Sequence, residues 1–244
     1  MTFSRVMSVQ RKAYSAGLAA VVLVTASVVA GYLYFQTFSP DRRKYPVRGL
    51  DVSHHQGEVD WGRVAADDVS FVILKATEGG DHVDRRFAAN LKEARDAGLV
   101  VGAYHFFTFC RSGADQAKNF IATVPRDGPL LPPVVDIEFG GNCPSRPSVA
   151  ELRAELDDFL VPVEQAFGKP AIVYLIGEAS DQYADAVPKR MRWLRSLVSH
   201  PGHEDWVYWQ YHNRGRVDGI EGDVDLNVLQ GDAAQLAALS GPPS

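Results

Sequence analysis

The sequence predicts an α/β protein: an irregular (β/α) barrel of the TIM type with reduced late helices, preceded by one N-terminal transmembrane helix. Three observations lead to this prediction. An uncharged apolar segment stands near the N-terminus. Short apolar runs then alternate with amphipathic helical segments, and the last runs follow one another with little room for helices between them. Eight strands in about 190 residues is tight for a regular barrel of this type.

The N-terminal segment at 17–35 is apolar, uncharged and long enough to cross a bilayer as a helix. Arg5, Arg11 and Lys12 precede it without any acidic residue, which predicts that the N-terminus stays in the cytoplasm. A cleaved signal peptide with a site at 28–30 is the alternative. The apolar run continues past that site, which favours a retained signal anchor.

We therefore expect five parts: a cytoplasmic N-terminus (1–16), a transmembrane signal anchor (17–38), a linker (39–46), the barrel (47–232) and a C-terminal tail (233–244). The barrel would lie in the periplasm or outside the cell, attached to a bacterial inner membrane by a single pass, or secreted if the segment is cleaved. The net charge of −5 gives no sign of a nucleic-acid partner. We expect a monomer.

Short apolar runs predict the strands, at 48–52, 71–75, 100–107, 133–137, 171–176, 191–197, 206–211 and 224–229. Their nearly continuous apolar character is typical of a parallel sheet covered on both faces. Helices are predicted at 84–97, at 114–124 and from Ser148, which forms a capping box with Glu151.

Four acidic residues stand at the ends of these strands or beside them: Asp51, Asp136, Glu138 and Asp225. The C-terminal rim of a parallel barrel is where catalytic groups lie. Asp136 and Glu138 are two apart on a strand, so both point to the same side and can influence each other's protonation. Glycoside cleavage uses such a pair, one protonated and one ionised. By itself, a D-x-E pair is equally typical of two surface acids.

Aromatic residues on the same strands suggest a cleft that stacks sugars, although each alone is more typical of a core. They are Tyr104, Phe106, Tyr174, Trp193, Trp209 and Tyr211. The histidines and cysteines lack the spacing of a metal site, and adjacent His54 and His55 are expected to point apart. No metal is predicted.

Several ordered motifs then match a known family. They are GLDVSHHQGEVDW (49–61), the run from FVILKATEGG to AYHFF (71–107), LPPVVDIE (131–138), PAIVY (170–174), WVYWQY (206–211) and GDVDLNV (222–228). Over about residues 47–230 the chain resembles the family 25 glycoside hydrolases, the Chalaropsis-type lysozymes.

The resemblance implies hydrolysis of the β-1,4 bond between N-acetylmuramic acid and N-acetylglucosamine in peptidoglycan, without a cofactor. It implies that Glu138 is the general acid and that Asp136 assists by orienting the acetamido group or stabilising charge. Asp51 and Asp225 match two further acids of that site. Tyr104, Tyr174, Trp209 and Gln210 match cleft residues.

Some alternatives stay open. Asp136 or Asp225 can attack directly, or the substrate's acetamido oxygen can do so. The barrel can also bind peptidoglycan with little turnover, anchoring a complex to the wall, or it can cleave chitin-like glycans. Three segments depart from the family pattern: 175–177, the basic run RMRWLRSL (190–197) and the loop after Glu138. These departures bear on glycan specificity more than on the reaction.

Cys110 follows the third predicted strand and Cys143 follows the fourth. Consecutive strands of a β/α barrel are neighbours, and both loops leave at the same rim. The two residues can therefore approach within disulfide distance, and a compartment outside the cytoplasm allows the bond to form. A pair of free thiols is the alternative.

Overall fold

The structure is a computed structural model that describes residues 3–187, 189–202 and 205–241. It divides into two compact units, Met1–Ser39 and Pro40–Ser244. The first unit contains one helix, α1 (Phe3–Thr37), of which Ala16–Thr37 has a mean hydropathy of 2.1. This segment is long and apolar enough to cross a membrane.

The second unit is built on a closed barrel of eight strands. The strands are β1 (Arg48–Val52), β2 (Phe71–Glu78), β4 (Val100–Phe106), β5 (Val134–Ile137), β6 (Ile172–Leu175), β7 (Met191–Arg195), β8 (Tyr208–Gly215) and β9 (Val224–Leu229). They follow the order β1-β9-β8-β7-β6-β5-β4-β2, and β1 pairs with β2 to close the ring. A short strand, β3 (His82–Val83), pairs only with β2. The predicted irregular barrel is confirmed.

The sequence predicts a parallel sheet, but one strand of the barrel, β9, is antiparallel to its neighbours. β9 pairs antiparallel with both β8 and β1. A parallel partner for β8 would need a crossover of a dozen or more residues, and the connection from Gly215 to Val224 is too short for one. The N-terminal end of β9 therefore lies at the rim where the other strands end.

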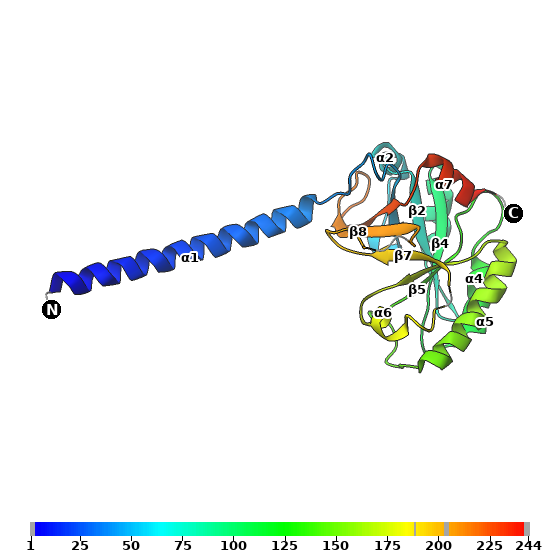
Figure 1. The fold of residues 1–244 in the computed structure, drawn as a ribbon. Helices are drawn as coiled ribbons and strands as arrows, with labels where there is room; N and C mark the ends of the chain where they lie inside the picture. Colours follow the sequence, from blue (N-terminus) through cyan, green and yellow to red (C-terminus); the bar gives the residue numbers. More distant parts are fainter. Residues whose placement is uncertain (1–2, 188, 203–204, 242–244) are drawn as a thin grey trace. The chain divides into compact units, whose positions relative to one another are not determined.

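Helices cover the outside of the barrel in its first two thirds. They are α2 (Trp61–Ala66), α3 (Phe87–Asp96), α4 (Gly113–Thr123), α5 (Val149–Phe167) and α6 (Gly177–Tyr183). Phe120 of α4 and Phe159 of α5 belong to the larger apolar core between helices and strands, and the two helices pack side by side (Figure 1). The predicted capping box of Ser148 and Glu151 opens α5. No helix lies between β7 and β9 in the described residues, as the sequence predicts.

A second apolar cluster fills the barrel interior, with Phe71, Ile73, Val134, Ile172, Trp193 and Tyr208 among its members. A Cβ at Gly49 would lie 2.3 Å from the Phe71 ring, so the interior accepts this ring only because the neighbouring strand has no side chain there. The interior below the rim is thus packed with side chains, and the open space lies above it.

Two predicted boundaries are wrong. The expected linker at 39–46 is packed into the second unit from Pro40 on: the ring of Tyr45 lies 5.6 Å from that of Trp209, and Arg48 Nη2 donates to the Pro40 carbonyl. The expected C-terminal tail forms a helix over most of its described length, α7 (Ala233–Ser240), which is opened by a capping box at Asp232. Leu236 of α7 is buried in the interior cluster. The burial of this apolar side chain stabilises the packing of α7 against the barrel.

Candidate active site

A pocket of about 420 Å³ lies at the rim where the parallel strands end. All four predicted acids line it, namely Asp51, Asp136, Glu138 and Asp225. The remaining lining residues are Ser53, His55, Gln56, Lys75, Glu78, Tyr104, Phe106, Gly140 and Gly141. The structure thus brings together acids that are separated by up to 174 positions in the sequence.

The D-x-E pair faces the pocket because of the alternation along β5. Val135 and Ile137 point outward into the core beneath the helices, so Asp136 points inward. Glu138 follows the last residue of β5 and also lines the pocket. Asp136 is buried, and its Oδ1 has no hydrogen-bond partner. A buried, unpaired carboxylate oxygen at a pocket is ready to bind a ligand.

Asp51 and Asp225 form a second pair. They are directly opposite each other in the antiparallel pairing of β1 with β9, and a hydrogen bond joins their carboxyl groups. This closeness requires the antiparallel direction of β9, because it brings the second residue of that strand to the rim. The two acids are therefore neighbours, although the sequence predicts a parallel strand at this position.

Two amide side chains hold Asp51. Asn227 Nδ2 donates to Asp51 Oδ2 at 2.7 Å, and Gln210 Nε2 donates to the same oxygen at 3.2 Å. The orientation of both amide groups is fixed by further hydrogen bonds. Trp193 Nε1 donates to Asn227 Oδ1, and the Tyr174 hydroxyl donates to Gln210 Oε1. Both amide oxygens are therefore occupied, and both NH₂ groups face Asp51.

This network changes the role of three residues that were predicted to bind substrate. Tyr174, Trp193 and Gln210 are buried and form the layer beneath the carboxyl groups rather than the lining of the pocket. Tyr104 and Phe106 do line it. Asn227 belongs to the same layer and was missed, because a single asparagine in an apolar strand carries no distinctive spacing.

Trp209 was predicted to lie in the cleft, but it is not among the residues that line the pocket. Gln210 points inward, so Trp209 points outward, where its ring packs against Trp206 at 6.1 Å and against Tyr45. Its Nε1 donates to the Ser196 carbonyl. Trp209 therefore belongs to an aromatic cluster on the outside of the barrel.

A partly buried ion pair at the pocket was also missed. Lys75 Nζ lies 2.7 Å from Glu78 Oε2 and 4.8 Å from the centre of the Phe106 ring. Residues three apart on a regular strand point to opposite sides. A bulge in β2 between Lys75 and Thr77 shifts the register by one residue, so both Lys75 and Glu78 face the pocket.

The four acids share one electrostatic tendency. Burial raises the pKa of each above its ordinary value, and repulsion from neighbouring carboxylates adds to this for Asp51 and Asp136. The cations Arg195 and Lys75 partly offset the rise in the pKa of Glu138. A carboxyl with a raised pKa stays protonated at a higher pH, as a general acid requires.

The histidines after β1 do not behave as expected. His54 and His55 lie in a short 3-10 helix, η1 (His54–Gln56), and their ring centres are 4.1 Å apart. The prediction that they point apart is wrong, because it assumed an extended strand. Asp84 anchors this turn by accepting from the His54 main-chain N–H at 2.9 Å and lying 2.8 Å from His54 Nδ1. The turn places His55 at the pocket.

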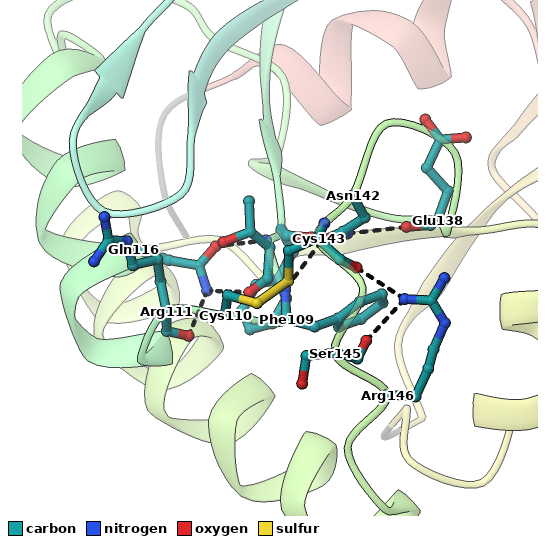
Figure 2. The surroundings of a disulfide bond; sticks show 11 residues. Phe109, Cys110, Arg111, Gln116, Glu138, Asn142, Cys143, Ser145 and Arg146 are labelled. Carbon is teal, nitrogen blue, oxygen red and sulfur yellow. Dashed lines mark hydrogen bonds between the residues drawn. A yellow bond between two sulfur atoms is a disulfide. The ribbon is translucent and has the colours of Figure 1, made fainter.

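The predicted disulfide is present. Cys110 and Cys143 are bonded, with their Cα atoms 6.3 Å apart. The bond joins the loops after β4 and β5. Beside it, Asn142 Nδ2 donates to the carbonyls of Phe107 and Glu138 at 2.8 and 2.9 Å. Figure 2 shows the Glu138 carboxylate directed away from this clamp, while its main chain is held by it.

The family model, the sequence relatives and the solved structures that match this chain all point to one family. Residues 50–220 match the model of the family described as glycosyl hydrolases family 25. Lysozyme M1 of Streptomyces globisporus is 36% identical over 210 residues, which covers 80% of this chain and 71% of the relative. The structure of a family 25 glycosyl hydrolase from Bacillus anthracis is 37% identical, with a TM-score of 0.77 over 84% of this chain and 97% of that one. The bacterial lysozyme from Streptomyces coelicolor is 33% identical, with a TM-score of 0.71 over 80% of this chain and 96% of that one.

Proposed function

This chain belongs to family 25 of the glycosyl hydrolases, and from that premise we propose that it cleaves the β-1,4 bond between N-acetylmuramic acid and N-acetylglucosamine, with Glu138 as general acid. The family makes it a glycoside hydrolase of the lysozyme type that acts on peptidoglycan. The assignment of the bond and of the residues is our proposal. One observation carries it: Asp136 and Glu138 open together into a pocket that also holds the Asp51–Asp225 pair.

Glu138 donates a proton to the glycosidic oxygen as the bond breaks. A water molecule supplies the hydroxyl that the anomeric carbon gains, and the proton of that water restores Glu138. Burial supports this role because it raises the pKa of the carboxyl. Asp136 accepts a hydrogen bond from the acetamido N–H of the sugar, through the Oδ1 that lacks a partner in the structure. Tyr104 and Phe106, whose rings line the pocket, contact the sugar faces.

We place the barrel outside the cytoplasm, where peptidoglycan is found. α1 holds it to the membrane as a signal anchor, with the basic residues before Ala16–Thr37 on the cytoplasmic side. The disulfide is compatible with this placement, because such bonds persist in oxidising compartments.

The test uses the full chain in detergent micelles with purified peptidoglycan. The products are reduced with borohydride and analysed by mass spectrometry, which identifies the sugar at each new reducing end. Reduced muramic acid ends are expected, and Glu138→Gln protein serves as the inactive control. Reduced glucosamine ends would refute the assigned bond. Binding to the wall without new ends would make the protein a peptidoglycan-binding barrel instead.

A further inference from the structure

The run RMRWLRSL (190–197) carries three arginines, and the structure gives them different surroundings. Arg190 precedes β7 and forms a two-pronged ion pair with Glu164, at 2.7 and 2.9 Å. Arg192 lines a separate pocket with Leu194 and with Val173, which belongs to the core outside the barrel. Arg192 therefore points away from the active-site pocket.

Arg195 points the other way. Met191 and Trp193 pack on the interior cluster, so the alternation of β7 turns Arg195 to the same side. It is the last residue of β7 and pairs in register with Gln210, whose amide holds Asp51. Its side chain thus stands one layer above Trp193 and is exposed at the barrel rim, where β7 ends. Its charge acts on Glu138 and Asp225.

Arg195 is free to bind a ligand. Within the described part of the chain, its side chain makes no hydrogen bond and no ion pair. Lys75, the other cation that acts on Glu138, is buried and already bound to Glu78. A guanidinium presents a planar fork of donors that matches a carboxylate, and here the fork is unoccupied beside a site that binds a glycan.

We propose that Arg195 is a specificity-determining residue that binds the carboxylate carried on the lactyl ether of muramic acid. This carboxylate is either that of the lactyl group itself or one on the peptide attached to it. The inference rests on the proposed function. A polymer of N-acetylglucosamine alone has no carboxylate, so a cation at this rim distinguishes peptidoglycan from chitin-like glycans.

The experiment compares four glycans: chains with peptides, chains stripped of peptides by an amidase, and each of these with its carboxylates converted to neutral methylamides. Kinetics are measured for the full chain, for Arg195→Gln and for Arg195→Lys, each at its own pH optimum. Arg192→Gln is the matched control, because it removes a charge from the other face of the same strand.

Arg195→Gln is expected to raise KM about three- to tenfold on a charged glycan, with kcat unchanged, as for a partly exposed arginine–carboxylate pair. KM on the neutral glycans should not change, Arg195→Lys should restore part of the loss, and Arg192→Gln should have no effect. A loss confined to stripped chains assigns the lactyl carboxylate, and a loss confined to peptide-bearing chains assigns the peptide.

An equal loss on charged and neutral glycans, or no loss on any, overturns the inference. The first result would mean that Arg195 acts only through its field on the acids. If the wild-type protein cleaves none of the four glycans, the proposed function itself fails, and that outcome is separate from the others.

Discussion

Asp51 and Asp225 face each other directly across the antiparallel pair of β1 and β9, and a hydrogen bond joins their carboxyl groups. Burial and the charge of Asp225 raise the pKa of Asp51 well above its ordinary value. A carboxyl whose pKa is raised by folding stabilises the protein at low pH. That contribution is lost as the pH rises through the folded-state pKa. The pair therefore costs stability at neutral pH.

Asp51→Asn is expected to raise the melting temperature at pH 7 to 8, because the amide cannot ionise. Each unit by which the pKa is raised corresponds to about 1.4 kcal/mol of stability regained above the folded-state pKa. The gain should shrink as the pH falls and the wild-type carboxyl takes up its proton. Thermal unfolding of both proteins at a series of pH values from 8 downward checks the expectation. A variant that is less stable than wild type at every pH would contradict it.

Glu138→Gln should reduce turnover by about 10² to 10⁴, because it removes the proton donor while keeping the shape of the side chain. The release of reducing ends from peptidoglycan measures the effect. Glu93→Gln on the exposed face of α3 is the matched control and should retain full activity. Circular dichroism must show that both variants are folded. Wild-type rates from folded Glu138→Gln protein would exclude this residue as the acid.

Asp136→Asn should also impair turnover, and its effect should not add to that of Glu138→Gln. The two carboxyl groups line one pocket, and Glu138 raises the pKa of Asp136. When two residues act as one unit, the first substitution already removes most of the rate enhancement, and the second removes little more. The comparison is kcat for the two single variants and the double variant. A double variant that is slower by the full product of the single losses would show that the acids act independently.

Loss of the disulfide through Cys110→Ser with Cys143→Ser should destabilise the folded protein. The bond closes a loop with a sequence separation of 33, for which the chain-entropy estimate is about 3 to 4 kcal/mol. Denaturant unfolding measures the difference. Asn142 still joins both loops in this variant, so we expect the loss in stability to exceed the loss in activity. Intact-mass analysis of unreduced, unfolded protein should show no thiol open to alkylation, and two alkylated thiols would refute the bond.

Alkaline phosphatase fused after Ser244 should be active in cells, because this reporter works only outside the cytoplasm. The expectation rests on the uncharged segment Ala16–Thr37 and the basic residues before it. A fluorescent reporter that folds only in the cytoplasm should stay dark in the same position, and the reverse result would overturn the placement. Recovery of the full-length chain in the membrane fraction would distinguish a signal anchor from a cleaved signal peptide.

Much of this protein is readable from its sequence, because the relevant signals are local. Apolar runs mark the strands to within a few residues, and the capping box of Ser148 and Glu151 marks the start of α5. The alternation of a strand is enough to place Asp136 and Glu138 on one side. The disulfide follows from the rule that loops after consecutive strands of a barrel leave at one rim. Each of these inferences needs only short-range periodicity or the order of the elements.

Tertiary structure decided strand direction, register and bulges, which local periodicity does not encode. The direction of β9 depends on its partners, and that direction brings Asp225 to Asp51. A bulge in β2 turns Glu78 toward Lys75, although their spacing alone would separate them. Trp209 and Gln210 are adjacent, and both are chemically plausible in a cleft. Because neighbouring residues of a strand point to opposite sides, only Gln210 points into the barrel. Strand direction, register and bulges are set by contacts between distant residues, and so the sequence determined which residues are available while the closed barrel decided which of them meet.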